Sequence, residues 1–173
     1  MNGWFDNSVK KAGFHDFFFV LSVGLRGGLW LLWNHNDLTN KVNIIRYTDR
    51  SIVCSMNYDN TIIYIIFVYA PSRDEENDTF WNNLQNYMNT LNGNVIVVGD
   101  LNEIENSEEK WGGVAPSNNR FNRLRLFRHN LDLINPPTTG NPFTWRRNRT
   151  NVNNTYEKLD RVLINSNLVH VFP

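Results

Sequence analysis

Residues 95–102 read Val95-Ile96-Val97-Val98-Gly99-Asp100-Leu101-Asn102, and the fold can be worked out from this stretch. The β-branched run predicts a short buried strand, which Gly99 brings to an end. Asp100 and Asn102 follow at a strand end, where a rigid sheet can hold polar groups at the rim of a cleft. Such a carboxylate can orient a nucleophile or help to hold a hard cation, and a carboxamide can donate to a phosphate oxygen. An ordinary Asp/Asn turn has the same sequence, so both interpretations stay open.

A second strand and a helix precede this stretch. Residues 62–68 are apolar on both faces, so we expect a central strand that is covered on each side and ends at Pro71. An acidic first turn at residues 74–76 then opens a helix whose apolar residues recur at helical spacing as far as Leu91. Tyr69 lies at the end of the central strand, where its hydroxyl could donate to a developing phosphoryl charge or its ring could pack in the core.

The remaining segments determine the fold class. A second amphipathic helix is expected from Phe121 to Leu131. Strands first, and then strands alternating with helices, predict an α+β sandwich in which helices cover the outer faces of packed, mostly antiparallel sheets. Without an internal repeat or linker, residues 1–173 are expected to form one domain. Short β-branched or aromatic runs predict strands at 17–23, 28–33, 42–48, 51–57, 61–70, 143–146 and 156–164.

The C-terminal third is basic although the whole chain has no net charge. Residues 1–117 carry 8 basic and 14 acidic side chains, whereas residues 118–173 carry 9 basic and 3 acidic ones. This part of the chain could therefore face an anion, and we expect Arg146, Arg147 and Arg161 to contact phosphate or DNA. Asp160 interrupts a predicted strand there, and Arg161 points to the opposite face, so the partner of Asp160 must come from elsewhere. A histidine is one candidate.

Several classes of protein are excluded or disfavoured. The single Cys54 cannot form an internal disulfide, which excludes a disulfide-stapled secreted scaffold and favours a reducing compartment. No stretch reaches the roughly 18 apolar residues of a membrane span, and the N-terminus does not resemble a secretory signal. The sequence also lacks a nucleophile elbow, a Walker-type phosphate loop, a zinc-binding cysteine pair and a His-Glu-x-x-His motif.

Taken in order, these pieces resemble the endonuclease/exonuclease/phosphatase superfamily with the DNase I-like fold, and within it the endonuclease domain of LINE-type (non-LTR) retrotransposons. The resemblance covers roughly residues 13–173 and rests on motifs that stand in the order typical of that family. They are Gly27-Gly28-Leu29-Trp30, Val68-Tyr69-Ala70-Pro71, Val98-Gly99-Asp100-Leu101-Asn102, Trp111-Gly112-Gly113, Phe143-Thr144-Trp145 and Lys158-Leu159-Asp160-Arg161.

The resemblance implies a four-layer α/β sandwich and metal-dependent hydrolysis of a phosphodiester in DNA, with Mg²⁺ or Mn²⁺ as the cofactor. It also implies a role for each matching residue. Asp100 would position the attacking water, and Asn102 would hold the phosphate or orient that aspartate. Tyr69 would hydrogen-bond the phosphoryl oxygens, and Asp160 would orient a catalytic histidine.

The family pattern extends beyond the motifs found here. It begins with a strand that bears an Asn, followed by a metal-ligating Glu, and it closes with a Ser-Asp-His element that supplies the general base. We expect this chain to be a domain truncated at both ends that lacks these parts, so its metal ligands are left unassigned. Loss of terminal strands would leave sheet edges open for self-association. Catalysis is expected to be weak or absent, because such residues act as a unit.

Two alternatives to a nuclease remain open. The basic third could make the chain a non-catalytic module that binds nucleic acid or phosphate, or the chain could be a small-molecule phosphatase of the same superfamily. Trp111-Gly112-Gly113 favours the retrotransposon branch over the phosphatase. We expect an intracellular protein, and a nuclear location is implied by the DNA substrate of the family.

Overall fold

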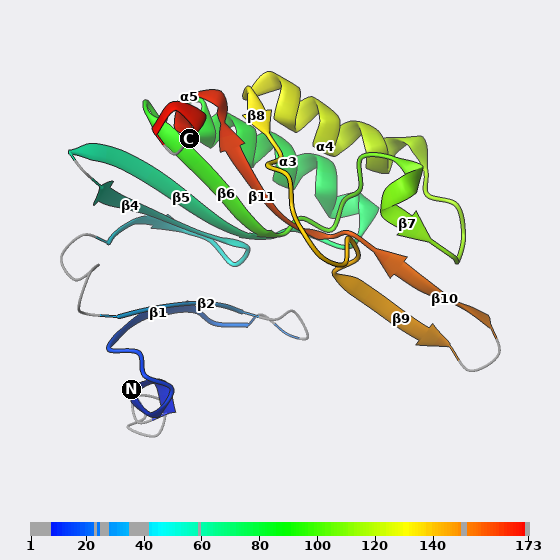
Figure 1. Ribbon diagram of the computed structural model, residues 1–173, viewed down its shortest axis with the longest axis horizontal. Coiled ribbons are helices and arrows are strands. Elements are labelled where there is room, and N and C mark those ends of the chain that lie inside the picture. The colour runs from blue at the N-terminus through cyan, green and yellow to red at the C-terminus, as the bar shows by residue number, and fades with distance from the viewer. Residues whose placement is uncertain are drawn as a thin grey trace.

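A six-stranded sheet forms the centre of the computed structural model, which describes residues 8–22, 24, 28–34, 42–58, 60–149 and 152–171 (Figure 1). Its strand order is β3-β4-β5-β6-β11-β8. Neighbouring strands are antiparallel except β5 and β6, which run parallel because a helix connects them. The strands are β3 Asn43–Tyr47, β4 Ser51–Tyr58, β5 Thr61–Tyr69, β6 Asn94–Asp100, β8 Leu133–Ile134 and β11 Asp160–Asn165.

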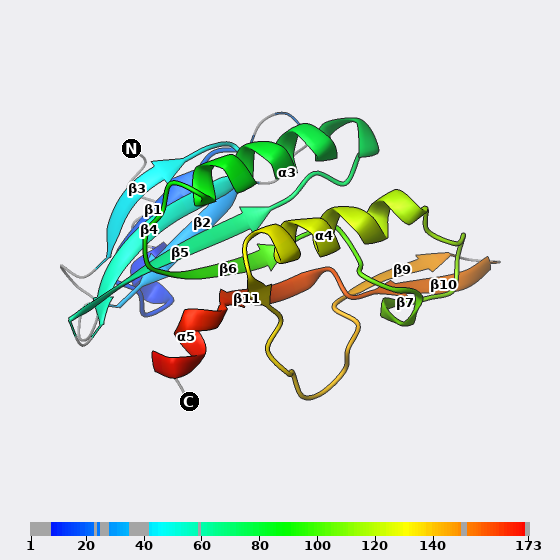
Figure 2. The same ribbon diagram turned by 90° about the horizontal axis from the view of Figure 1, so that it is seen from above.

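Two helices cover one face of this sheet. α3 (Asp74–Met88) connects β5 to β6, and α4 (Asn118–Asn130) lies beside it on the same face (Figure 2). Both helices bury apolar residues against the sheet, and the rings of Trp81 and Phe127 meet between them with centroids 4.8 Å apart. The main core therefore lies between the helices and the six-stranded sheet.

The opposite face of the sheet is covered by a hairpin made of β1 (Asp16–Val20) and β2 (Leu29–Trp33). Its Phe18 ring contacts Tyr47 of β3 with centroids 5.1 Å apart, and a helical turn at residues 8–11 lies beyond it (Figure 1). The order is helices, sheet, smaller sheet and helical turn, so the predicted α+β class with packed sheets is confirmed. Val23, the predicted end of the first strand, lies outside the described residues.

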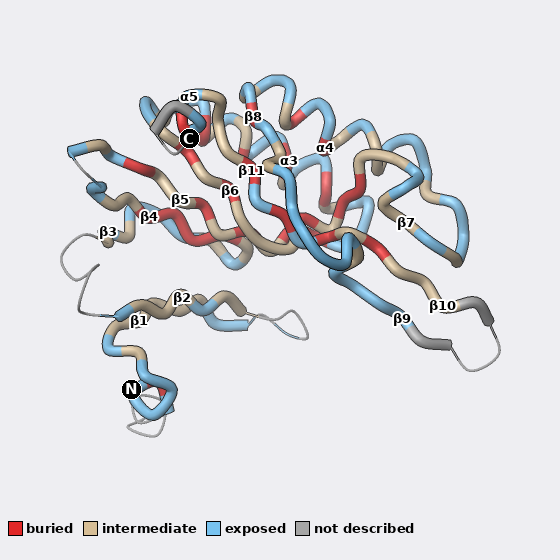
Figure 3. The backbone as a smooth tube through the Cα atoms, viewed as in Figure 1, coloured by how far each residue is buried: buried red, intermediate tan, exposed pale blue. Residues whose placement is uncertain are grey.

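A third, three-stranded sheet projects from the body, with the order β7-β10-β9 (Figure 1). It consists of β7 Lys110–Trp111, β9 Trp145–Arg149 and β10 Val152–Glu157, and a 3₁₀ turn, η1 (Ser107–Glu109), leads into β7. Residues 145–147 of β9 are exposed, in contrast to the many buried residues of the central strands (Figure 3). The chain continues through β11 into α5 (Ser166–Val171). Within the described ranges, no helix is long and apolar enough to cross a membrane.

The single strand predicted at residues 156–164 is wrong, because the structure divides it into β10 and β11, which belong to different sheets. The break falls at Lys158 and Leu159. There the Oγ1 atom of Thr144 accepts hydrogen bonds from the backbone N–H groups of Leu159 and Asp160, both at 3.0 Å. A side chain thus replaces strand partners at the turn, which strand periodicity could not reveal.

Candidate active site

Three of the predicted site residues lie side by side at one edge of the six-stranded sheet. Tyr69 of β5 is in register with Asp100 of β6, and Asp100 is in register with Asp160 of β11. Residues directly opposite each other in a sheet share a face, so the phenol and the two carboxylates form one row across three strands. All three sit at or next to a strand end, where the sheet meets its loops.

Gly99 lets the strands come together just before this row. It lies opposite Val68 with φ +138°, and a Cβ atom in its place would be 2.1 Å from the Val68 carbonyl oxygen. A larger residue would push β5 away from β6 at the point where Tyr69 and Asp100 meet.

Asn102 is fixed next to this row by its own hydrogen bonds. Its backbone N–H donates to Asp100 Oδ1 at 3.0 Å, and its side-chain Nδ2 donates to the Ala70 carbonyl oxygen at 2.7 Å. The residue adopts a left-handed conformation with φ 50°, which Asn tolerates better than most residues. With Nδ2 bound to Ala70, the Oδ1 atom is the part of the carboxamide left to accept a further bond.

The electrostatic environment favours binding of a cation. Burial raises the pKa of Asp100, the hydrogen bond from Asn102 lowers it, and the nearby charge of Asp160 raises it further, so that the net shift is upward. Among the described residues, no basic side chain forms an ion pair with either carboxylate. Two facing carboxylates repel each other, and a bound cation would remove that repulsion.

Asp100 and Asp160 fit the way in which Mg²⁺ is usually held, by one or two carboxylates together with waters and substrate phosphate. A ligand set supplied by the protein alone is not present, since within the described ranges no group of three or more His, Cys, Asp and Glu residues is placed to hold a metal. The histidine that Asp160 would orient belongs to the Ser-Asp-His element of the family, and none of the described histidines takes its place. No hydrogen bond or ion pair joins the exposed carboxylate of Asp160 to another described residue.

Arg50 was not anticipated as part of this region. Its guanidinium lies 5.9 Å from the centre of the Tyr69 ring, its carbonyl accepts from the Tyr69 N–H at 2.9 Å, and Glu76 of α3 pairs with it at 2.7 Å. In the sequence it is half of the turn Asp49-Arg50. Its approach to Tyr69 depends on the pairing of β4 with β5, so no local signal could have found it.

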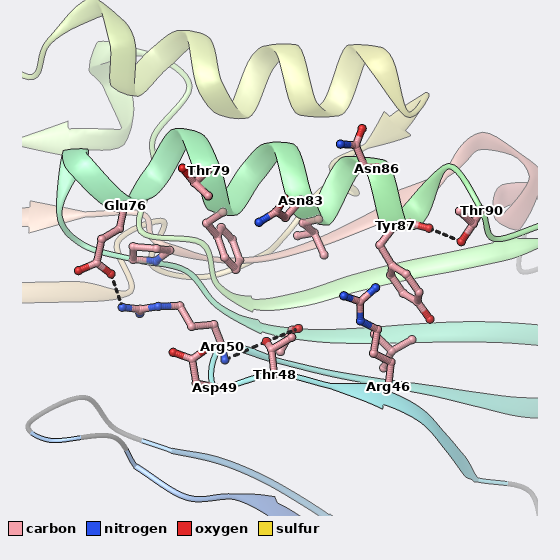
Figure 4. A pocket seen from close by; sticks show the side chains of 15 residues that line it. Arg46, Thr48, Asp49, Arg50, Glu76, Thr79, Asn83, Asn86, Tyr87 and Thr90 are labelled. Atoms are coloured by element: carbon pink, nitrogen blue, oxygen red, sulfur yellow. Dashed lines mark hydrogen bonds and ion pairs between the residues drawn. The ribbon is translucent and has the colours of Figure 1, made fainter.

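Arg50 also lines a cavity of about 690 Å³ between α3 and the turn that joins β3 to β4. Figure 4 shows the Arg50–Glu76 pair at one end and Arg46 beside the Tyr87 ring at the other, where the guanidinium lies 4.5 Å from the ring centre. The cavity borders the site at Pro71 but contains neither candidate carboxylate.

The position of Arg161 corrects the expectation that it contacts DNA. Its side chain is fully buried and pairs with Glu109 through two nitrogen–oxygen contacts of 2.7 and 2.5 Å. It also donates to the Lys158 carbonyl at 3.0 Å. With no exposed side from which to reach a phosphate, Arg161 has a structural role. Arg120, Arg123 and Arg128 likewise pair with acidic residues, so much of the basic character of the C-terminal third is neutralised internally.

Arg146 and Arg147 lie apart from the carboxylates, on the exposed strand β9 of the projecting sheet. The Arg146 guanidinium lies 5.4 Å from the centre of the Tyr156 ring. Tyr156 in turn contacts Trp111 and Phe143, with ring centroids 5.5 and 5.9 Å apart. An exposed arginine over an aromatic cluster, with a second exposed arginine next to it in the strand, suits a nucleic acid, which offers both phosphates and stacking surfaces.

Solved structures with a similar fold are all distant in sequence. The endonuclease domain of TRAS1, a telomere-specific non-LTR retrotransposon, aligns at a TM-score of 0.65 and 14% identity, covering 91% of this chain and 70% of that one. The AP endonuclease LMAP from Leishmania major gives 0.65 and 14%, covering 89% and 63%. The 3′ phosphatase NExo from Neisseria, bound to a product DNA hairpin, gives 0.64 and 13%, covering 95% and 71%. The chain thus spans about two thirds of these proteins.

These likenesses confirm the fold, which is the one expected from the resemblance to the endonuclease/exonuclease/phosphatase superfamily. Among curated proteins, none matches the chain. A family model described as endonuclease-reverse transcriptase matches residues 63–171. Because this match spans more than half of the sequence, the chain belongs to the endonuclease-reverse transcriptase family.

Proposed function

We propose that this chain is a DNA endonuclease domain of the LINE retrotransposon type, which cleaves a phosphodiester bond. The observation that carries the proposal is the row of Tyr69, Asp100 and Asp160 across three neighbouring strands, with Asn102 fixed beside it. The family match covers all four residues and the TRAS1 domain shares the fold, which supports this branch.

Each residue has a chemical task that suits its position. Asp100 accepts a hydrogen bond from the attacking water and so orients the lone pair of the water oxygen toward the phosphorus. Tyr69 donates from its hydroxyl to a phosphoryl oxygen as negative charge builds up. Asn102 holds Asp100 in place through its backbone N–H. Asp100 and Asp160 are the residues that would hold a divalent cation, which neutralises charge on the phosphate when bound.

Nicking of supercoiled plasmid tests the proposal. The wild-type chain is incubated in Mg²⁺ or Mn²⁺ and then in EDTA, with Asp100→Ala and Asp160→Ala beside it. Glu75→Ala is the control, since this exposed carboxylate on α3 makes no contact at the site. We expect weak metal-dependent nicking in the wild type and the control and its loss in both aspartate variants. A folded wild type that does not nick would refute catalysis.

A second function, DNA binding without cleavage, is favoured by the exposed Arg146 and Arg147. It predicts that duplex DNA binds the folded chain in EDTA and that Asp100→Ala leaves this binding intact. Hydrolysis of a soluble phosphate ester with plasmid left untouched would instead indicate a small-molecule phosphatase.

A further inference from the structure

The loop of residues 101–109, which links β6 to β7 and carries Asn102, is held by ion pairs that are wholly or partly buried. Glu105 pairs with Arg128 of α4 at 2.6 Å, and Glu109 pairs with Arg161 of β11. The fully buried Glu103 pairs with Arg123 at 2.8 Å. Loops are usually the mobile parts of a fold, whereas this one is anchored to a helix and a strand on several sides.

Arg120 of α4 differs from the other anchoring residues in what it joins. One of its nitrogens donates to the carbonyl oxygen of Asn102 at 3.2 Å and to Glu157 Oε2 at 3.0 Å. Its Nε atom lies 3.5 Å from Glu103 Oε2. Glu157 belongs to β10 and also binds the Lys110 ammonium of β7. A single guanidinium therefore links the turn that carries Asn102 to the projecting sheet.

The hydrogen bond from Arg120 to the Asn102 carbonyl oxygen is the third contact that fixes Asn102 in its left-handed backbone conformation. Asn102 has φ 50°, and such conformations persist where the surroundings determine them. Ala70 holds its side chain and Asp100 its backbone N–H, while Arg120 holds its carbonyl. The planar guanidinium lets Nη1 and Nη2 both bind the Glu157 carboxylate while Nη2 also donates to the Asn102 carbonyl, a fixed arrangement that the single nitrogen of a lysine ammonium does not reproduce.

We propose that Arg120 is a positioning residue for the candidate active site. Through Asn102 it fixes the turn that orients Asp100, and through Glu157 it fixes that turn relative to the sheet that carries Arg146 and Arg147. The effect on catalysis rests on the proposed endonuclease function, whereas the effect on the turn does not.

Hydrogen exchange of the Asn102 amide tests the effect on the turn, with Arg120→Met compared with Arg128→Met. Arg128 is the matched control, because it lies on the same helix and pairs with the same loop but contacts neither Asn102 nor Glu157. We expect Arg120→Met to speed exchange at Asn102 about tenfold more than Arg128→Met does. Arg120→Lys keeps the charge beside Glu157, and it replaces Arg120→Met in this comparison if the methionine variant does not fold. Equal exchange in the Arg120 and Arg128 variants would overturn the proposal.

Nicking kinetics test the effect on catalysis. Loss of Arg120 should lower kcat about tenfold while KM for DNA stays within about twofold, because Arg120 contacts the turn beside the reacting residues, whereas Arg146 and Arg147, the residues proposed to bind DNA, are unchanged. An active enzyme whose kcat is unchanged by Arg120→Met contradicts the catalytic role. If the wild type itself does not nick, the exchange difference still supports the positioning of the turn, and it is the endonuclease function that fails.

Discussion

At the residue scale, Asp100 and Asp160 lie opposite each other at the candidate active site, whereas Arg161, next to Asp160 in the sequence, is buried against Glu109. Asp100 and Asp160 could be selected because each follows or interrupts an apolar run. Arg161 follows Asp160 in the motif Lys158-Leu159-Asp160-Arg161. Because side chains alternate along a strand, the sequence correctly predicts that the two side chains lie on opposite faces. The burial of Arg161 against Glu109 depends on a segment 52 residues away along the chain, which no local pattern could supply. The contact between Arg50 and Tyr69 could not be predicted for the same reason.

Replacing Asp100 by Asn should stabilise the fold while abolishing nicking. The raised pKa means that the folded chain holds a proton on Asp100 more tightly than the unfolded chain does, so ionisation of this group weakens folding as pH rises above its ordinary value near 3.8. Asn keeps an acceptor for the Asn102 N–H and removes the charge that faces Asp160. We expect a gain of roughly 0.2–1 kcal/mol at pH 7, measured by urea denaturation. A variant less stable than the wild type at pH 7 would contradict this electrostatic explanation.

Replacing Arg161 by Met should destabilise the fold strongly. Its removal leaves the Glu109 carboxylate, which is only 12% exposed, without its cation. Breaking such a pair costs about 3–5 kcal/mol, detectable in urea or thermal unfolding. The double variant Arg161→Met with Glu109→Met should recover part of the loss. Arg125→Met, on the exposed side of α4, is the control. A loss no larger than that of the control would show that Arg161 is not structural.

At the scale of elements, the sequence indicated most of the strands and both large helices, since their apolar spacing is local information. What it could not show was the division of the predicted strand at residues 156–164 between two sheets, because Thr144 makes that turn from a separate segment. The division matters for function. It separates the projecting sheet that carries Arg146 from the sheet that carries Asp160.

The projecting sheet should account for much of the affinity for DNA. Arg146→Ala and Arg147→Ala should each weaken binding to duplexes of any sequence and reduce the slope of log K against log salt by about 1. Fluorescence anisotropy across a salt series measures both quantities, with Arg125→Ala as the control. Unfolding free energies should stay within about 0.5 kcal/mol of the wild type, since both side chains are exposed. Slopes that match the control would mean that DNA binds elsewhere.

At the scale of the whole molecule, part of the uneven distribution of charge along the sequence holds the fold together. Acidic residues of the first two thirds form ion pairs with basic residues of the last third, and several of these pairs involve the loop of residues 101–109. Arg123, for example, joins Asp74 and Asp78 of α3 to the buried Glu103. A tally of charges along the chain could not distinguish a surface that binds an anion from one that pairs internally, because it contains no distances.

This pairing makes stability sensitive to acid. Burial alone would raise the pKa of Glu157, but hydrogen bonds from Arg120 and Lys110 outweigh it and hold the pKa below its ordinary value of 4.5. The pKa of Glu109 is lowered in the same way, since the hydrogen bond from Arg161 and the other contacts that favour the charged form together outweigh burial. A carboxyl with a lowered pKa contributes stability that is complete above its unfolded value and is lost as pH falls through its folded value. The stability that Glu157 and Glu109 contribute should therefore be lost as the pH falls below about 4.5 and through their lowered pKa values.

The substitution Glu157→Gln measures how much of this loss of stability in acid comes from Glu157. At pH 7 the variant should be about 1–3 kcal/mol less stable than the wild type, because Arg120 and Lys110 lose a charged acceptor. As the pH falls through the lowered pKa of Glu157, the folded wild type takes up a proton there, and the two should converge. Urea denaturation at a series of pH values measures the difference, and Glu75→Gln provides an exposed control. A difference between Glu157→Gln and the wild type that does not shrink in acid would show that the side chain stabilises the fold through its shape and not through its charge.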